Sequence, residues 1–300
     1  MITHVLAGGS ITERQNNPGA IRLLRAQREL YSEAKRWRRT GARAVVVSAI
    51  VGLTATILVP AALKYVGPLG AVVATAQWLL SLVERQRTMS AAAIQEQFDT
   101  SVLPLPWNDV LCGYVDPEDV VGAAERHKGP DTKLTDWYPL PAGVAPPHDV
   151  LLCQRMNLRW DSKLRRGYAN NLLASLSFLA LLLVAAGVAR QLTVGEWVLA
   201  VLPTIGAFRV GAEAIRAQRQ HGFRQESLKK KVEAIWAQAK ADPDSVGVPE
   251  HRAVQDGIYH LRVTAPPVPD TYYLRKRQQF EREAQTAAAV LWDEAKKLSS

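Results

Sequence analysis

Long uncharged apolar runs alternate with charged segments along the chain. The first run covers residues 44–63, a stretch of 20 residues without a charged side chain. At a helical rise of about 1.5 Å per residue, this length matches a hydrocarbon core about 30 Å thick. A second uncharged run follows the turn at residues 64–68 and continues to Val83. The pattern predicts that residues 44–83 form a transmembrane helical hairpin.

A second pair of apolar runs lies further along the chain. Residues 167–189 form a run of 23 uncharged residues with arginines on both sides. The following run, residues 191–208, is weaker because it contains Glu196 and Pro203. A charge near the membrane surface costs less than the about 2.5–3.5 kcal/mol expected at the membrane centre. We therefore expect a second transmembrane hairpin over residues 167–208, with a re-entrant or interfacial helix as the alternative for its second half.

Segments with helical periodicity flank these hairpins. Asn17 is suited to cap a helix and Pro18 to occupy its first turn, and apolar residues recur at helical spacing from there to Trp37. We expect an amphipathic helix within residues 1–43 and a helical region over residues 209–300. Near the end of the chain, a narrow apolar seam suits self-association or packing on the chain's own helices. The seam consists of Ala284, Ala288, Leu291, Ala295 and Leu298.

The segment between the hairpins, residues 84–166, is rich in proline and aromatic residues. Prolines at this density favour turns over a continuous helix. Trp107, Trp137 and Tyr138 are candidates for stacking on a planar ligand, and the alternative is that they form the small core of this segment.

Three basic residues at the end of this segment are candidate phosphate ligands. Arg155, Arg159 and Lys163 are four residues apart, so on one helix they would present a common basic face. The alternative is that they pair with nearby acidic side chains or anchor the start of the third apolar run.

Charge distribution predicts the orientation in the membrane. The chain has 37 Lys and Arg residues against 28 Asp and Glu. The two hairpin turns carry only Lys64 and Arg190 of these basic residues. Because basic segments are retained on the cytoplasmic side, the N-terminus, the middle segment and the C-terminus should all be cytoplasmic. This explains the basic excess without DNA or RNA binding, and no nucleic-acid polymer is expected as a partner.

Signatures of catalysis and metal binding are missing from the sequence. It contains no HExxH, GxSxG, Walker-type phosphate loop or GxGxxG motif. Cys112 and Cys153 do not form a CxxC pair, and the six histidines are scattered singly. We therefore predict no active site, no metal site and no cofactor. Together these patterns predict a mainly α, multi-pass membrane protein with two hairpins, four spans and long cytoplasmic helices.

Short motifs spread over the chain resemble those of the SMODS-associated four-transmembrane effector family. They are Gln15-Asn16, Leu24-Arg25-Ala26-Gln27-Arg28-Glu29-Leu30-Tyr31, Ala34-Lys35, Phe98-Asp99, Leu105-Pro106-Trp107-Asn108, Trp137-Tyr138-Pro139, Cys153-Gln154-Arg155, Asn157, Trp160-Asp161, Leu164-Arg165, Gln255-Asp256 and Val268-Pro269-Asp270. The order of these motifs around two hairpins makes the resemblance fairly specific, and it extends over nearly the whole chain.

The resemblance implies a pore-forming effector of bacterial antiphage defence. A partner nucleotidyltransferase would make a cyclic or linear oligonucleotide messenger, and this protein would then permeabilise the inner membrane and end the infection by arresting or killing the cell. Oligomerised copies could line a pore with polar residues of the spans, although such residues also serve as ordinary interhelical hydrogen-bonding groups. The candidates are Thr54, Gln77, Asn170, Asn171 and Ser175.

Two other classes of function compete with this interpretation. A non-catalytic membrane scaffold would use the amphipathic cytoplasmic helices to dock a partner defence protein. A small transporter is less favoured, because charges at the membrane midplane and internal repeat symmetry are not evident.

Overall fold

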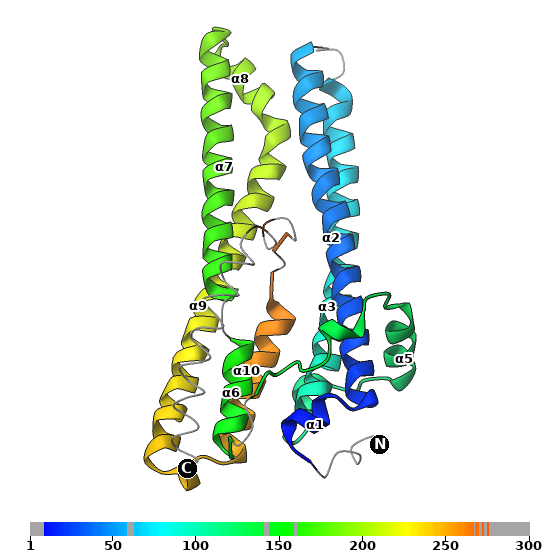
Figure 1. The fold of residues 1–300 in the computed structure, drawn as a ribbon. Coiled ribbons are helices and arrows are strands. Elements are labelled where there is room, and N and C mark those ends of the chain that lie inside the picture. The colour runs from blue at the N-terminus through cyan, green and yellow to red at the C-terminus, as the bar shows by residue number, and fades with distance from the viewer. Residues whose placement is uncertain are drawn as a thin grey trace. The chain divides into compact units, whose positions relative to one another are not determined.

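A computed structural model describes residues 9–58, 63–140, 144–158 and 161–266, together with residues 268, 269, 272 and 275. The elements in this part of the chain are α-helices and short 3-10 helices, and the described residues form no strand (Figure 1). They are α1 (Ile11–Gln15), α2 (Pro18–Leu58), α3 (Leu63–Val102), α4 (Asp109–Cys112), α5 (Pro117–Arg126), η2 (Asp131–Lys133), α6 (His148–Asn157), α7 (Asp161–Ala189), α8 (Val194–Val201), η3 (Leu202–Thr204), α9 (Ile205–Ala241), η4 (Pro243–Ser245) and α10 (Val248–Thr264). The mainly helical fold predicted from the sequence is confirmed.

The chain divides into two compact units, each built from separate stretches of sequence. Unit 1 comprises Met1–Ser32, Arg87–Leu164 and His221–Ser300, as far as these ranges are described. Unit 2 comprises Glu33–Gln86 and Arg165–Gln220. Unit 2 contains the four apolar runs. Unit 1 contains most of the polar segments that lie before, between and after these runs in the sequence.

Long helices cross the divisions expected from the sequence. The start of α2 at Pro18 is confirmed, and the Asn17 side chain accepts a hydrogen bond of 2.9 Å from the Gly19 amide. From there α2 continues to Leu58 without a break at residue 43. No proline interrupts this stretch, so nothing ends the helix where its polar part meets the apolar run. α3 likewise runs through residue 83, and α9 through residue 208.

Clusters of buried apolar side chains hold the helices of unit 1 together. In one cluster, Val120, Ala123 and Ala124 of α5 pack against small and aliphatic residues of α2 and α3. In another, Leu151 and Leu152 of α6 pack with apolar residues of α9 and α10. The α9 residues of that cluster are Val232, Ile235, Trp236 and Ala239, and the partly buried Leu228 packs against it.

Close helix contacts in unit 2 occur at small residues. A Cβ atom at Gly41 of α2 would lie 3.5 Å from the Gln77 side chain of α3. A Cβ atom at Gly187 of α7 would lie 2.3 Å from the Trp197 ring of α8, whose indole N–H donates to the Leu183 carbonyl at 3.0 Å. Because only glycine leaves room for that ring, this contact fixes how α7 and α8 meet.

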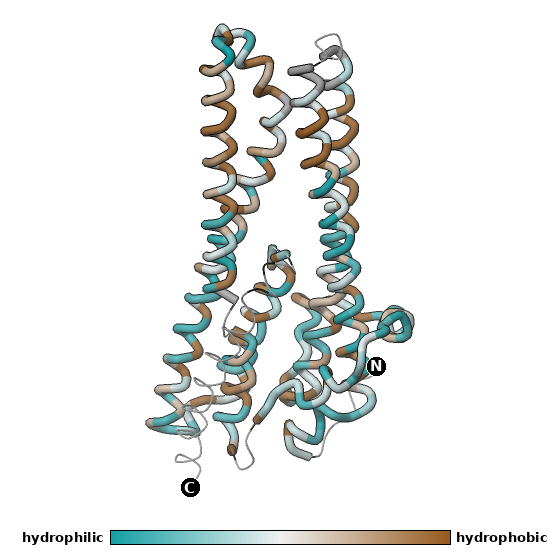
Figure 2. The backbone as a smooth tube through the Cα atoms, turned by 45° about the horizontal axis from the view of Figure 1, so that its top comes forward, coloured by the Kyte–Doolittle hydropathy of each residue, from teal (hydrophilic) through white to brown (hydrophobic). Residues whose placement is uncertain are grey.

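One helix is long and apolar enough to cross a membrane by itself. Residues Lys163–Ala189 have a mean hydropathy of 2.5 in their most apolar window, and 6% of that window is buried. The helices Val194–Val201 and Ile205–Ala241 pass the same test only as a pair, and they are bent by 59°. Figure 2 shows apolar residues gathered along the parts of α2, α3, α7 and α8 that belong to unit 2. One span, or two if the bent pair counts as one, is therefore found among the described residues, and the four-span topology remains a prediction.

Glu196 begins a helix rather than interrupting one. It forms a capping box with Thr193, whose backbone amide donates to the Glu196 carboxylate at 2.9 Å. A carboxylate at a helix N-terminus accepts from free amides and faces the positive end of the helix dipole. This local role explains how a charge is accommodated within the fourth apolar run.

Candidate functional site

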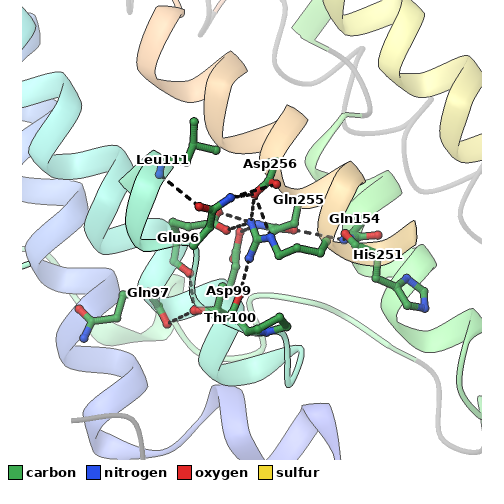
Figure 3. Close-up of polar contacts among 12 residues, drawn as sticks. Glu96, Gln97, Asp99, Thr100, Leu111, Gln154, His251, Gln255 and Asp256 are labelled. Carbon is green, nitrogen blue, oxygen red and sulfur yellow. Dashed lines mark hydrogen bonds and ion pairs between the residues drawn. The ribbon is translucent and has the colours of Figure 1, made fainter. Parts of the chain in front are cut away.

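Two acidic side chains of α3 lie fully buried inside unit 1. Glu96 and Asp99 are one helical turn apart, and both have no exposed surface. The neighbouring helix face is built from small residues such as Ala92 and Ala93, which are also buried. Figure 3 shows the two acids pointing toward α10. Buried carboxylates require partners, because removing an unpaired charge from water costs several kcal/mol.

Two arginines of α10 supply these partners. Arg262 places its Nη1 atom 2.6 Å from an Asp99 oxygen and 3.6 Å from a Glu96 oxygen. Arg252 donates from Nη2 to Glu96 at 2.5 Å. Both guanidinium side chains are almost completely covered, with exposed fractions of 11% and 12%. The two pairs therefore join α3 to α10 in an environment where ionic interactions are strong.

Neutral side chains complete the contacts of Asp99 and Glu96. The Gln255 amide nitrogen donates to Glu96 at 2.8 Å and to Asp99 at 2.9 Å. The Tyr138 hydroxyl donates to Asp99 at 2.6 Å and accepts from Asn157 at 2.9 Å. These bonds add the loop before α6 and the end of α6 itself to the α3–α10 pair.

A second set of bonds extends the network toward α4. Arg252 donates from Nε to Asp256 at 2.9 Å and from Nη1 to the Pro106 carbonyl at 3.0 Å. Asn108 donates to the two Asp256 oxygens at 3.3 and 3.2 Å while it caps α4. The Pro106-Trp107-Asn108 loop is thus held against α10 by polar contacts.

Two buried glutamines bind backbone groups of distant segments. Gln15 donates to the Tyr138 carbonyl at 3.1 Å and accepts from the Tyr138 amide at 2.7 Å. Gln154 of α6 donates to the His251 carbonyl at 2.7 Å and to the Gln255 side-chain oxygen at 3.4 Å. We call the set of residues joined by these contacts the polar network. It comprises Gln15, Glu96, Asp99, Asn108, Tyr138, Gln154, Asn157, Arg252, Gln255, Asp256 and Arg262.

Burial changes the acid–base properties of the network. It raises the pKa of Glu96, the nearby Asp99 carboxylate raises it further, and Arg262 acts in the opposite direction. Burial also raises the pKa of the Tyr138 hydroxyl well above its usual value, and Asp99 adds to that shift. The network holds three carboxyl groups and two guanidinium groups. A proton on Glu96 would leave two carboxylates facing two guanidinium groups.

The arrangement is suited to holding helices together in one specific register. Each carboxylate is engaged by arginine or amide donors from other elements, so a shift of α10 along α3 would break several charged contacts at once. Within the described ranges, no group of three or more His, Cys, Asp or Glu side chains is placed to hold a metal ion.

The aromatic ligand candidates lie in or beside this network. Tyr138 is 2% exposed and stacks on Phe98 with ring centroids 6.2 Å apart. Trp137 meets the same Phe98 ring edge-on at 6.3 Å. Trp107 is half-buried, and its indole N–H donates to the Gly113 carbonyl at 3.2 Å. The contacts of Trp137 and Tyr138 are those of core residues, which agrees with the alternative stated for them.

The basic candidates do not form the single helical face expected from their spacing. Arg155 lies on α6, which ends at Asn157, and Lys163 lies on α7, which begins at Asp161. That expectation was wrong, because the helix they were to share ends between them. Arg155 pairs with Glu233 at 3.4 Å, and Lys163 is exposed. Arg159 lies outside the described residues, as do residues 59–62 at the end of the first apolar run and the C-terminal seam at residues 284–298. The turn predicted at residues 64–68 was wrong, because α3 begins at Leu63 and continues through Pro68 as a helix.

The candidate pore-lining residues lie on helices of unit 2. Thr54, Asn170, Asn171 and Ser175 are exposed, and Gln77 is half-buried beside Gly41. Their exposure leaves these four side chains available to neighbouring chains or to a lumen.

Comparison with known proteins places the chain in a family. A model of the SMODS-associating 4TM effector domain matches residues 9–291. The chain belongs to this family. A probable CBASS effector molecule of Bacillus cereus (strain VD146) is 26% identical over 290 residues, which cover 91% of this chain and 95% of that protein. No solved structure matches the chain.

Several of the motifs that carried the resemblance to the family contribute residues to the polar network. Gln15, Asp99, Asn108, Tyr138, Gln154, Asn157, Gln255 and Asp256 all belong to it. They come from segments up to 241 positions apart in the sequence (Gln15 to Asp256). The motifs that supply these residues, although far apart in the sequence, therefore meet in one connected network.

Three charged members of the network were missed from the sequence. Glu96, Arg252 and Arg262 look like ordinary surface residues when read singly. A usable signal was present in helical spacing, because Arg252, Gln255 and Arg262 follow each other by three and seven positions and so share one helix face.

Proposed function

We propose that this 4TM effector permeabilises the bacterial inner membrane in response to a nucleotide second messenger, during defence that sacrifices the infected cell. A partner nucleotidyltransferase would supply the messenger. The chain acts as an oligomer in the lipid bilayer, with four spans and with both termini in the cytoplasm. It needs no cofactor or active site of its own.

The observation that carries this proposal is the combination of family membership with an unburied apolar helix. The family match covers residues 9–291, and the α7 window suited to a membrane is only 6% buried. A helix that exposes large side chains such as Phe178 (64%) and Leu181 (68%) requires lipid or other helices around it. The named relative, a probable CBASS effector molecule, supports a defence role.

The residues that we propose to bind the messenger are those predicted from the sequence. Their side chains differ in how accessible they are to a ligand. Trp107 and Trp137 are half-buried, Lys163 is exposed, and Arg155 already has an acidic partner in Glu233. Tyr138 is the least accessible of the described candidates, so we assign it to positioning the loop rather than to stacking on a base. Arg159 stays a candidate on its sequence position alone.

The direct test is leakage of dye or ions from liposomes that contain the purified full chain. A panel of cyclic and linear oligonucleotides is added to separate samples. We expect leakage with one nucleotide and a tight membrane with the others. No leakage from inserted, folded protein with any nucleotide would contradict the proposal and favour the scaffold interpretation.

Matched variants locate the conducting path. Asn170→Leu with Asn171→Leu removes two exposed polar side chains from α7, and Leu173→Ala alters an apolar side chain on the same helix, which is 44% exposed. If the asparagines line the pore, the double variant lowers ion leakage several-fold, while Leu173→Ala leaves it close to the unmodified level. Equal leakage from both variants would remove these residues from the pore.

A further inference from the structure

Two surfaces of unit 1 have opposite charge and each exposes apolar side chains. The first, which we call the acidic patch, is formed by residues 109–121 and contains no lysine or arginine. Val110 is 100% exposed and Tyr114 is 79% exposed. Four exposed carboxylates lie near them in the sequence, at Asp109, Asp116, Glu118 and Asp119.

The second surface, which we call the basic face, lies on α9. Phe223 is 75% exposed, an unusual position for a large aromatic ring on a charged helix. Arg224, Lys230 and Lys231 are exposed and fall within about 120° of Phe223 at 100° per residue. Residues 223–231 carry four basic side chains and one acidic one, Glu226. The opposite face of α9 is buried in the cluster with α6 and α10.

Both surfaces are exposed in the single chain. Cys112 within the acidic patch packs beside Tyr259 of α10, and α5 at the other end of the patch packs against α2 and α3. The basic face points away from its own cluster, because the residues on the other side of α9 are the buried ones. Both surfaces are therefore accessible to a second molecule.

We propose that the acidic patch of one copy binds the basic face of a second copy. The charges are complementary, and burying Phe223 against Val110 and Tyr114 would give an apolar centre with a charged rim, as in known protein interfaces. Because two different surfaces meet, the contact is head-to-tail and continues from copy to copy, closing into a ring or extending as an array. This inference concerns assembly alone and does not depend on permeabilisation.

Disulfide trapping in membranes of cells that make the full chain tests the contact directly. Tyr114→Cys and Phe223→Cys are combined in one chain, which is then oxidised. A head-to-tail contact gives a ladder of crosslinked dimers, trimers and larger species. Each single variant can reach dimers at most, because it offers one new thiol and the native Cys112 and Cys153 are buried. A matched control combines Tyr114→Cys with Val248→Cys, since Val248 is 51% exposed on α10 of the same unit.

Charge reversal tests the same contact by a second route. In the Tyr114→Cys, Phe223→Cys background, Lys230→Glu with Lys231→Glu should reduce the ladder at least ten-fold. Glu118→Lys with Asp119→Lys should do the same, and the chain with all four reversals should regain the ladder because its surfaces are complementary again. That recovery would also show that the reversals do not prevent folding.

Three results would overturn the proposal. The first is the absence of species beyond the dimer in the Tyr114→Cys, Phe223→Cys chain. The second is an equal ladder in the Val248→Cys control, which would indicate random collision. The third is a ladder that persists in either single-surface reversal.

Discussion

Unit 1 contains charged side chains that pair with one another in its interior, whereas the helices of unit 2 turn large apolar side chains outward. Glu96 and Asp99 have no exposed surface in unit 1, while Val72 and Val188 of unit 2 are 66% and 74% exposed. In unit 1, apolar groups are buried and the enclosed charges are paired, as is expected of a unit in water. In the membrane that we propose for unit 2, hiding apolar groups would gain nothing, and close packing at small residues such as Gly187 would hold the helices together. The contrast identifies which contacts stabilise each part.

The largest effect is expected from the removal of one buried cation from unit 1. Arg262→Ala leaves Asp99 and Glu96 buried with less compensation, which should cost about 3–5 kcal/mol. Hydrogen exchange of the α3 and α10 amides measures this as a loss of local protection. Arg209→Ala is the matched control, because its pair with Glu213 is exposed and should contribute at most about 0.5 kcal/mol. Equal effects of the two changes would show that the polar network does not stabilise unit 1.

A glycine substitution tests the packing of unit 2 in the same manner. Gly187→Ala places a Cβ atom 2.3 Å from the Trp197 ring, so the ring or a helix must move, at an expected cost of about 1–3 kcal/mol. The thermal unfolding midpoint of the detergent-solubilised chain should fall, and tryptophan fluorescence should change. At Gly195 a Cβ atom meets nothing within 4 Å, and Gly195→Ala should leave both measurements almost unchanged.

The Tyr138 hydroxyl can be removed while the aromatic ring is kept. Tyr138→Phe keeps the ring that stacks on Phe98 but removes the donor to Asp99 and the acceptor for Asn157. Loss of bonds to a buried charged group should cost about 1–2 kcal/mol. We expect faster hydrogen exchange around residues 134–140 and 150–157, with exchange in α7 unaffected. Unchanged exchange in those segments would place the Tyr138 hydroxyl outside the stabilising network.

The smallest expected effect is a pH dependence confined to unit 1. Burial lowers the pKa of His148 and also the pKa of His251. The His148 ring meets the Trp236 ring edge-on, with ring centroids 5.1 Å apart. As the pH falls below about 6.5 the unfolded chain takes up these protons first, so stability decreases. The raised pKa of Glu96 acts in the opposite direction, because the folded state binds that proton more tightly.

A substitution isolates the histidine contribution. His148→Phe keeps an aromatic ring beside Trp236, and it should reduce the drop in unfolding temperature between pH 7.5 and pH 5.5. His260→Gln, at an exposed position of α10, should leave the drop unchanged. A drop of the same size in His148→Phe would assign the acid sensitivity to other groups.

The helices were predictable from the sequence, but the way they divide into units was not. Apolar runs and the Asn17-Pro18 pair located α2 and α7, because length and capping act locally. The uninterrupted passage of α2 through residue 43 was missed, since a change from polar to apolar composition looks like a boundary although nothing in the backbone ends the helix there.

The candidate site was predictable only in part, for a related reason. Asp99 and Tyr138 were identified from the sequence only as members of separate motifs, and an aspartate is usually exposed. The burial of Asp99 depends on Arg262, which is 163 positions away and becomes its neighbour only through the fold. The basic face expected over Arg155 and Lys163 failed because a helix end between them cannot be recognised from charge spacing.

Unit 1 is built from three separate stretches of sequence, so it can be completed only late in translation. Arg252 and Arg262 follow every apolar run of the chain, so the ribosome makes them after all the candidate membrane segments. Until then Glu96 and Asp99 have no guanidinium partner, and unit 1 cannot close. The apolar helices can thus enter the membrane early, while completion of the unit that encloses the polar network is delayed until translation reaches α10. A nascent or truncated chain that stops before Arg252 would carry the apolar helices without that closed unit.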